Sequence, residues 1–299
     1  MNFDWNDLRF FLNLVRTNSY QGAARRLRVD HTTVRRRITS LEDALQARLF
    51  STREQPLELT AAGEQMLRYA ESIEALTQQA TESLNGANNE LIGTVRIGVL
   101  DGFGTCFLTP RLKPLLDKHP QLKIELVVLS RLFNLSNREA DIAIAPAPAE
   151  QRRLIVRKLT DSRLFLSASD DYLAEHPIEK LEDISSHRIV TYLPELVFSP
   201  EMDYLNFIDP PVSRTFEATN VIAQLEAVAG GIGIGLLPYF MTARYPNVRR
   251  VLPDRFSLDR EYWLVAHPDT INIARIRTVI DYLVAIVKAD HKLFTGELD

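Results

Sequence analysis

The stretch AARRLRVDHTTVRRRITSLEDAL, residues 23–45, decides the fold of the N-terminal part of this chain. It predicts two short amphipathic helices on either side of a tight turn at Arg28, with six arginines around that turn. Ser19 is placed to cap the first of these helices, and the small side chains of Ala23 and Ala24 allow another helix to approach closely. This pattern is typical of a helix-turn-helix that docks on DNA.

The second helix of the pair is predicted to begin after Asp30, whose carboxylate suits an N-cap. Its apolar residues recur at helical spacing, so one face belongs to a core and the opposite face is free. Arginine can bond guanine bidentately and threonine can contact a thymine methyl group. The alternative is a solvated arginine face with no partner. The residues predicted to contact DNA are Ser19, Gln21, His31, Thr32, Thr33, Arg35, Arg36, Arg37, Thr39 and Arg53.

Segments on both sides complete a predicted head over residues 1–60. Residues 5–17 carry apolar side chains at helical spacing and predict a scaffold helix. Residues 49–60 alternate loosely and contain Pro56, which favours two short strands joined by a turn. We interpret these strands as a wing.

A long helix is predicted after Thr60, within a segment covering residues 61–90. Its apolar positions alternate at spacings of four and three, as in a coiled-coil seam. We expect this seam to form a dimer, and the alternative is packing against the chain's own body. The seam consists of Met66, Ala70, Ile73, Thr77, Ala80 and Leu84. Residues 85–90 break the pattern and predict a linker.

Composition narrows the class of protein. The 299 residues carry a net charge of −4, yet residues 1–62 alone carry +3 and the remainder −7. A basic head on an acidic body is expected when phosphates are met at one end only. One cysteine and six histidines without ligand spacing predict neither a disulfide framework nor a metal site. No apolar stretch suggests a leader or a membrane span, so a soluble cytoplasmic protein is expected.

From residue 94 onward, strand-like and helical segments alternate, which predicts an α/β body of parallel sheets with helices on both faces. The expected strands are residues 95–100, 123–129, 141–145, 163–168, 188–192, 233–237 and 262–267. The expected helices are residues 109–118, 218–229 and 272–288, the last with an apolar stripe of Ile273, Ile276, Ile280, Leu283 and Val287.

Two functional classes are alternatives to a protein that reads a DNA sequence. An enzyme is suggested only by the glycines of residues 231–235, and the dinucleotide pattern needs a strand before them and a helix after them, the reverse of what is predicted here. No enzymatic activity and no cofactor are therefore expected. An architectural protein that bends DNA without sensing a metabolite is the third class. An α/β body of about 200 residues argues against it, since such bodies commonly hold a ligand cleft, which serves little purpose without an occupant.

The residues resemble those of LysR-type transcriptional regulators over nearly the whole chain. The N-terminal match is the specific one: Ala23-Ala24, Leu27, Asp30, Ile38, Leu41-Glu42, Leu45, Leu49-Phe50, Leu59-Thr60 and Ala62-Gly63. The C-terminal match consists of Val95-Arg96-Ile97-Gly98, Ala140-Asp141-Ile142-Ala143-Ile144, Ala227-Val228 and Gly233-Ile234-Gly235-Leu236-Leu237-Pro238.

The resemblance implies a winged helix-turn-helix, a dimerising linker helix and an effector domain over residues 91–299. That domain would consist of two Rossmann-like α/β lobes similar to periplasmic binding proteins, with a small-molecule cleft between them. Lobe 1 would take residues 91–162 and 267–299, and lobe 2 residues 163–266, with two crossing strands as the hinge. The implied partners are operator DNA, a second copy of the chain in a homodimer or homotetramer, and a small-molecule effector. The resemblance also leaves room for RNA polymerase and implies no membrane partner.

Two departures from the family pattern bear on the DNA target. Among the polar positions of the family's common Leu-Ser-Arg-Gln-Ile in the recognition helix, only Arg36 is retained, so the operator sequence should differ. In the wing, Thr52 stands where the family usually has arginine, and Arg53 follows one position later.

The predicted cleft is built around Asp101, in a loop whose two glycines would let a ligand approach the backbone. A carboxylate there would repel an anionic effector and suit an amine or a hydroxyl-rich compound, unless Asp101 is a surface or capping residue. Thr219 and Asn220 could equally be helix caps, and Cys106 is interpreted as a buried apolar residue rather than a redox sensor. The candidate effector-binding residues are Asp101, Gly102, Phe103, Gly104, Thr105, Phe133, Ala145, Pro146, Thr191, Tyr192, Thr219 and Asn220.

Overall fold

The computed structural model describes residues 3–51, 57–85, 91–129, 140–148, 154–197 and 214–297. It divides into two compact units, one containing Met1–Glu90 and the other containing Leu91–Phe133, Ala140–Ile271 and Arg275–Asp299. We call the first unit the head and the second the body. The predicted contact residues Arg53 and Phe133 and the side chain of Leu84 lie outside the described residues.

The helices of the head begin and end where local sequence signals place them. Ser19 Oγ accepts a hydrogen bond from the Gly22 N–H at 3.2 Å, and Asp30 Oδ1 accepts one from the Thr32 N–H at 2.9 Å. Arg28 closes the turn in the left-handed conformation, with φ of 56°. The predicted bounds of the first three helices are therefore confirmed. The head helices are α1 (Trp5–Thr17), α2 (Tyr20–Leu27), α3 (His31–Leu45) and α4 (Ala61–Asn85).

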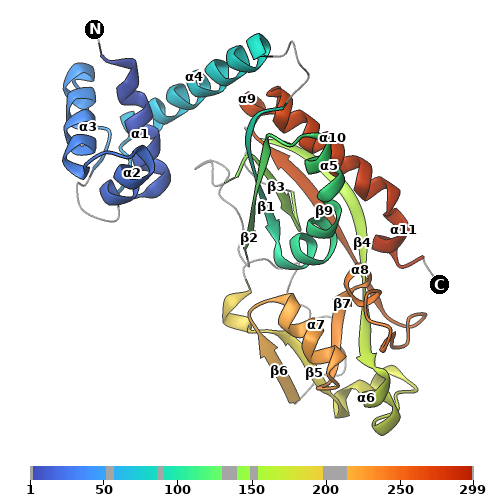
Figure 1. The fold of residues 1–299 in the computed structure, drawn as a ribbon. Coiled ribbons are helices and arrows are strands. Elements are labelled where there is room, and N and C mark those ends of the chain that lie inside the picture. The colour runs from blue at the N-terminus through green and yellow to red at the C-terminus, as the bar shows by residue number, and fades with distance from the viewer. Residues whose placement is uncertain are drawn as a thin grey trace. The chain divides into compact units, whose positions relative to one another are not determined.

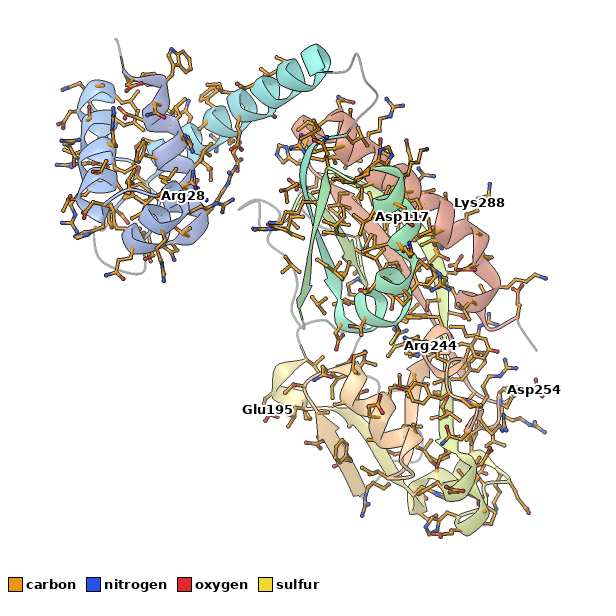
Figure 2. All side chains as sticks on the ribbon, in the orientation of Figure 1. Arg28, Asp117, Glu195, Arg244, Asp254 and Lys288 are labelled. Atoms are coloured by element: carbon orange, nitrogen blue, oxygen red, sulfur yellow. The ribbon has the colours of Figure 1, made fainter. Side chains whose placement is uncertain are left out.

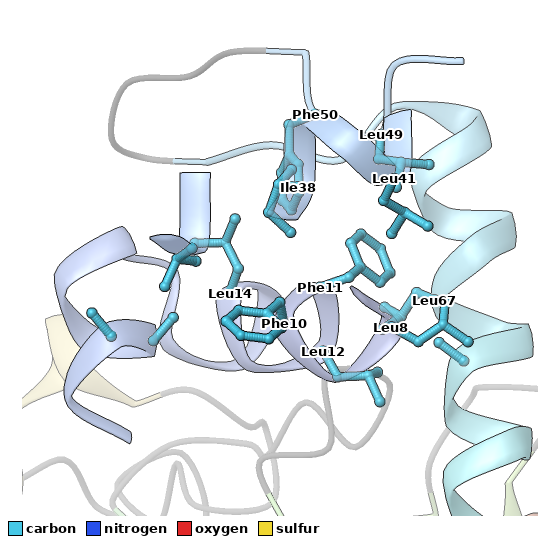
Figure 3. Close-up of a cluster of buried hydrophobic side chains, with 14 residues drawn as sticks. Leu8, Phe10, Phe11, Leu12, Leu14, Ile38, Leu41, Leu49, Phe50 and Leu67 are labelled. Atoms are coloured by element: carbon cyan, nitrogen blue, oxygen red, sulfur yellow. The ribbon is translucent and has the colours of Figure 1, made fainter. Parts of the chain in front are cut away.

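A continuous apolar core holds these helices together (Figure 3). Phe11 from α1 and Leu41 from α3 are fully buried in it, and Leu67 attaches the start of α4 to the same cluster. Ala23 and Ala24 are buried too, which confirms that α2 packs closely against its neighbours.

The connection between α3 and α4 is held by a buried carboxylate. Glu42, only 4% exposed, accepts hydrogen bonds from the Leu49 N–H at 2.8 Å and from Arg48 Nη1 at 3.0 Å. The predicted pair of wing strands appears, in the described residues, as one antiparallel bridge between Phe50 and Leu59. Thr60 Oγ1 then accepts the Gly63 N–H at 3.0 Å, which confirms Thr60 as the cap of α4.

The described strands of the body form one sheet (Figure 1), in the order β2-β1-β3-β9-β4-β7-β5-β6, with β8 paired to β4. Their bounds are β1 (Gly93–Leu100), β2 (Leu122–Leu129), β3 (Ile142–Ala145), β4 (Ile155–Ser169), β5 (Arg188–Tyr192), β6 (Arg214–Ala218), β7 (Ile234–Pro238), β8 (Val248–Arg250) and β9 (Ser257–Ala266).

Two long strands, β4 and β9, pass through both lobes of the body and pair antiparallel along most of their length. The β1–β2 and β1–β3 pairs are parallel in one lobe, as are the β5–β6 and β5–β7 pairs in the other. The predicted parallel pairing is present in both halves of the sheet, and β4 and β9 add antiparallel pairs that the alternation of strands and helices did not predict. Strands β6 and β8 were not predicted.

The α-helices of the body are α5 (Lys113–Lys118), α6 (Asp170–Glu175), α7 (Val221–Ala229), α8 (Tyr239–Thr242), α9 (Pro268–Ile271), α10 (Ala274–Ala289) and α11 (His291–Thr295). Shorter turns are a π-helical turn at Phe103–Leu108 and 3-10 turns at Thr109–Arg111, Leu181–Ser186 and Pro194–Leu196. The predicted apolar stripe of α10 is buried throughout, which confirms it. The predicted loop after β1 is instead helical from Asp101 onward.

Candidate functional site

The exposed side of α3 lies opposite its buried side, as a groove-reading helix requires. Val34 and Ile38 are 0% and 2% exposed, while Thr32 and Arg36 are exposed. Among the other predicted contact residues, His31, Arg35 and Gln21 are exposed, and Ser19, Thr33 and Thr39 are half-buried. The side chains at the start of α3 are therefore accessible to a partner.

Asp30 fixes the first turn of α3. Its Oδ1 accepts hydrogen bonds from both the backbone N–H and the hydroxyl of Thr32, at 2.9 and 2.8 Å, and His31 Nδ1 lies 3.3 Å away. The Thr32 N–H, and then the Thr32 hydroxyl, lower the pKa of Asp30. Thr32 thus presents its methyl group and its hydroxyl oxygen from a preset rotamer.

Arg37 points back into the head and not toward a partner. Its Nη1 donates to Asp4 Oδ2 at 2.8 Å and to Asp7 Oδ1 at 3.2 Å, and its guanidinium lies 5.7 Å from the Phe10 ring centroid. Burial raises the pKa of Asp7, and the charge of Arg37 opposes that shift. The structure therefore places Arg37, predicted as a DNA contact, in an ion-pair cluster that ties α3 to α1.

The predicted seam of α4 packs partly against the head itself. Ala70 is 1% exposed, and Met66 and Ile73 pack on the head core, while Thr77 and Ala80 are exposed. Among the described side chains of α4, the large apolar ones left exposed are Tyr69, 59% exposed, and Leu76, 63% exposed. The exposed apolar face thus lies one position away from the predicted seam.

A small cavity of about 40 Å³ lies between the lobes of the body. Four predicted effector-binding residues line it: Asp101, Gly102, Pro146 and Tyr192. The remaining lining residues are Leu100, Ser162, Leu164, Val221, Pro238, Met241, Arg260, Glu261 and Tyr262. The structure thus brings together part of the predicted set with residues of β4, α7, β7, α8 and β9.

Asp101 connects the two lobes. Its Oδ2 accepts a hydrogen bond at 2.9 Å from the N–H of Val221, the first residue of α7. Burial raises the pKa of Asp101, and the N–H groups of Val221 and Gly102 oppose the shift. Asp101 thus makes the capping bond considered from the sequence, and it makes that bond to a helix 120 residues away while also lining the cavity.

The shifted pKa predicts a pH dependence of stability. Because the pKa in the folded state lies above the ordinary value of 3.8, the stabilising contribution of protonated Asp101 is present at low pH and is lost as pH rises through the folded pKa. We expect the wild type to lose stability relative to Asp101→Asn as the pH rises from 3.8 through the raised folded-state pKa of Asp101. Urea unfolding at a series of pH values measures this difference, and parallel profiles would contradict the prediction.

Several predicted effector-binding residues have other roles. Phe103 is 0% exposed and belongs to an aromatic cluster, and Asn220 caps α7 by accepting the Ala223 N–H at 2.8 Å. A side chain at Gly104 would meet Val99 at 2.4 Å, so this glycine serves packing and not ligand approach. Thr105 and Thr219 are exposed, Ala145 is half-buried and Thr191 is buried, and none of these four lines the cavity.

Sequence reasoning missed the floor of the cavity on the crossing strands. Ser162 and Arg260 are register partners in the β4–β9 pair, and Leu164 and Tyr262 each lie two residues further along their strand, on the same face. The Ser162 hydroxyl is buried without a hydrogen-bond partner. The sequence signal that could have identified Ser162 is the alternation of inward- and outward-facing residues in β4, which begins before the predicted start of that strand.

Cys106 is buried, and this burial raises the pKa of its thiol against the opposing effect of Arg244. A raised pKa disfavours the reactive thiolate, consistent with the interpretation of a packing residue. Within the described ranges, no cluster of three or more His, Cys, Asp or Glu side chains is suited to a metal ion. No helix in the described part of the chain is long and apolar enough to span a membrane.

Comparison with known proteins identifies both units. Residues 5–64 match the family "Bacterial regulatory helix-turn-helix protein, lysR family", and residues 88–287 match "LysR substrate binding domain". The glycine cleavage system transcriptional activator homolog of Haemophilus influenzae is 26% identical over 294 residues, covering 95% of each chain.

Solved structures share the fold. A full-length OxyR variant of Pseudomonas aeruginosa has a TM-score of 0.69 at 20% identity and covers 96% of this chain and 98% of its own. Full-length LysG of Corynebacterium glutamicum with bound effector Arg has a TM-score of 0.65 at 19% identity and covers 96% and 99%.

Proposed function

The chain belongs to the LysR family of bacterial transcriptional regulators, and we propose that it reads a specific operator with α3 and is controlled by a small molecule bound in the body. The first part of this proposal rests on the exposed side chains of Thr32 and Arg36 on α3. Val34 and Ile38, on the opposite side of the same helix, are buried in the core of the head. The charge of +3 on residues 1–62 supports contact with phosphates.

The cavity beside Asp101 supports the second part. It lies at the carboxyl end of β1 and at the N-terminus of α7, where open α/β sheets bind ligands. LysG, which shares the fold, was solved with bound effector Arg. A ligand that fits one lobe arrangement better than another would shift the population of DNA-binding states. We expect binding without turnover, and we place the protein in the cytoplasm, where operator DNA lies.

Selection from a random duplex library tests this function. Full-length protein at fixed salt should enrich an interrupted inverted repeat, because two α3 helices of a symmetric pair read two half-sites. Binding that changes with salt but enriches no sequence would instead favour a sequence-tolerant architectural protein.

We further propose that the exposed apolar face of α4, Tyr69 and Leu76, is covered by the same face of a second copy. Leu76→Glu places a charge in that contact, and we expect it to weaken dimerisation about 100-fold, or about 2.7 kcal/mol. Sedimentation equilibrium measures the change.

Thr77→Glu is the matched control, since it adds the same charge at an exposed neighbour that belongs to the seam predicted from sequence. If Thr77→Glu dissociates the dimer and Leu76→Glu does not, the contact uses the predicted seam instead.

A further inference from the structure

The N-terminus of α7 is the position in this cleft where an anion would be expected to bind. The helix runs over nine residues, and its first N–H groups carry partial positive charge. The carboxylate of Asp101 already occupies this position, because its Oδ2 lies 2.9 Å from the Val221 nitrogen. A carboxylate or phosphate ligand would therefore find the helix N-terminus occupied and would be repelled by the negative charge of Asp101.

The described side chains that line the cavity include two carboxylates, Asp101 and Glu261, and one guanidinium, Arg260. The groups that favour the ionised form of the buried Asp101 are backbone N–H groups, of which the Val221 N–H contributes most. Glu261 adds a second carboxylate to the cavity wall, with Lys158 Nζ at 2.6 Å from its Oε1. Arg260 also lines the cavity, and its Nη1 donates to the Asp259 carbonyl at 2.9 Å.

A second observation independently points to a ligand. The Ser162 side chain lines the cavity, the residue is 2% exposed, and its hydroxyl has no hydrogen-bond partner. Buried hydroxyls in native proteins are nearly always paired, because an unpaired one loses its hydration without compensation. A ligand that donates a hydrogen bond to this hydroxyl, or accepts one from it, would supply the missing partner.

The other residues that line the cavity, and its volume, limit the polarity and the size of the rest of the ligand. Leu164, Val221 and Met241 present apolar surface to the cavity. Its volume of about 40 Å³ admits about three water-sized groups. A short carbon chain fits this space.

We propose that the cleft binds a small aliphatic primary amine as its ammonium ion. The nitrogen lies between the Asp101 carboxylate and the Ser162 hydroxyl, and the carbon chain lies against Leu164 and Met241. This inference rests on the proposed function, in which this cleft is the effector site.

Calorimetric titration of the full-length protein tests the ligand class. Propylamine, propan-1-ol and acetate are probes of equal size, with about four non-hydrogen atoms each. We expect propylamine to bind with a dissociation constant of about 0.1 to 10 mM, propan-1-ol at least about tenfold more weakly, and acetate not measurably.

Variants assign the contacts. Asp101→Asn keeps an oxygen that accepts the Val221 N–H while removing the charge, and should weaken propylamine binding at least about tenfold. Ser162→Ala should weaken it about three- to tenfold without lowering the thermal stability of the free protein. Asp254→Asn removes an exposed carboxylate at the edge of the body (Figure 2) and should leave binding unchanged.

Three outcomes overturn the proposal: acetate binding as tightly as propylamine, propylamine affinity unchanged in Asp101→Asn, or no binding of propylamine. Selection of operator DNA by the same protein preparation distinguishes failure of the proposed ligand class from failure of the proposed function. Specific DNA binding without amine binding overturns only the ligand class, whereas loss of specific DNA binding overturns the proposed function.

Discussion

Replacing Arg36 by alanine is expected to weaken binding to the selected operator about 10- to 100-fold, or about 1–3 kcal/mol. Arg36 is exposed on α3, and the cap at Asp30 fixes the start of that helix. A guanidinium in the major groove bonds guanine bidentately, so its loss should relax specificity at one position of each half-site. Fluorescence anisotropy at fixed salt, on operator and scrambled duplexes, measures both quantities.

Two further variants interpret that result. Arg255→Ala removes an exposed arginine of the body and should leave operator affinity unchanged. Arg37→Ala leaves the buried Asp7 without its guanidinium partner, so it should destabilise the head before it affects base reading. An Arg36→Ala protein with unchanged operator affinity would remove α3 as the reading helix.

Replacing Phe294 by alanine is expected to lower the free energy of unfolding of the body by about 3–5 kcal/mol. Phe294 in α11 is 0% exposed, and its ring centroid lies 4.6 Å from that of Phe107 and 5.0 Å from that of Phe240. The phenyl ring fills the centre of an aromatic cluster, so its removal leaves a cavity that the surrounding rings cannot fill without repacking. Urea unfolding measures the loss.

Phe294→Leu retains most of the volume and should cost less than the alanine variant. Leu293→Ala, at a half-buried neighbour, provides a comparison outside the cluster. Equal losses for Phe294→Ala and Leu293→Ala would show that α11 attaches weakly and that the cluster is not a cohesive core.

The helices of the head could be predicted from the sequence because their signals are local. Ser19 and Asp30 cap helices within three residues of themselves, and the apolar spacing of α3 identifies its buried side without knowledge of the partner. The seam of α4 shows the limit of this reasoning. A heptad pattern marks a buried face, but it does not say whether the head or a second chain covers Ala70.

The cleft could be predicted only in part, because its residues come from distant segments. Asp101 was identified from the end of a strand, but its bond to Val221 joins positions 120 residues apart. Ser162 and Arg260 face the cavity because β4 and β9 continue beyond their predicted starts, through segments whose charged residues obscured the alternation. Which residues line the cavity depends on pairing between strands that are distant in sequence, and a local pattern does not contain that information.

The long antiparallel pairing of β4 with β9 has a mechanical consequence. A ribbon of hydrogen-bonded strands resists sliding and stretching but yields to torsion, so the lobes can rotate about it more readily than they can separate. The ladder is interrupted between Lys158 and Thr160, immediately before Ser162. A ligand bound at Ser162, as proposed, would lie close to this bulge, where the strands are locally bent and more strongly twisted.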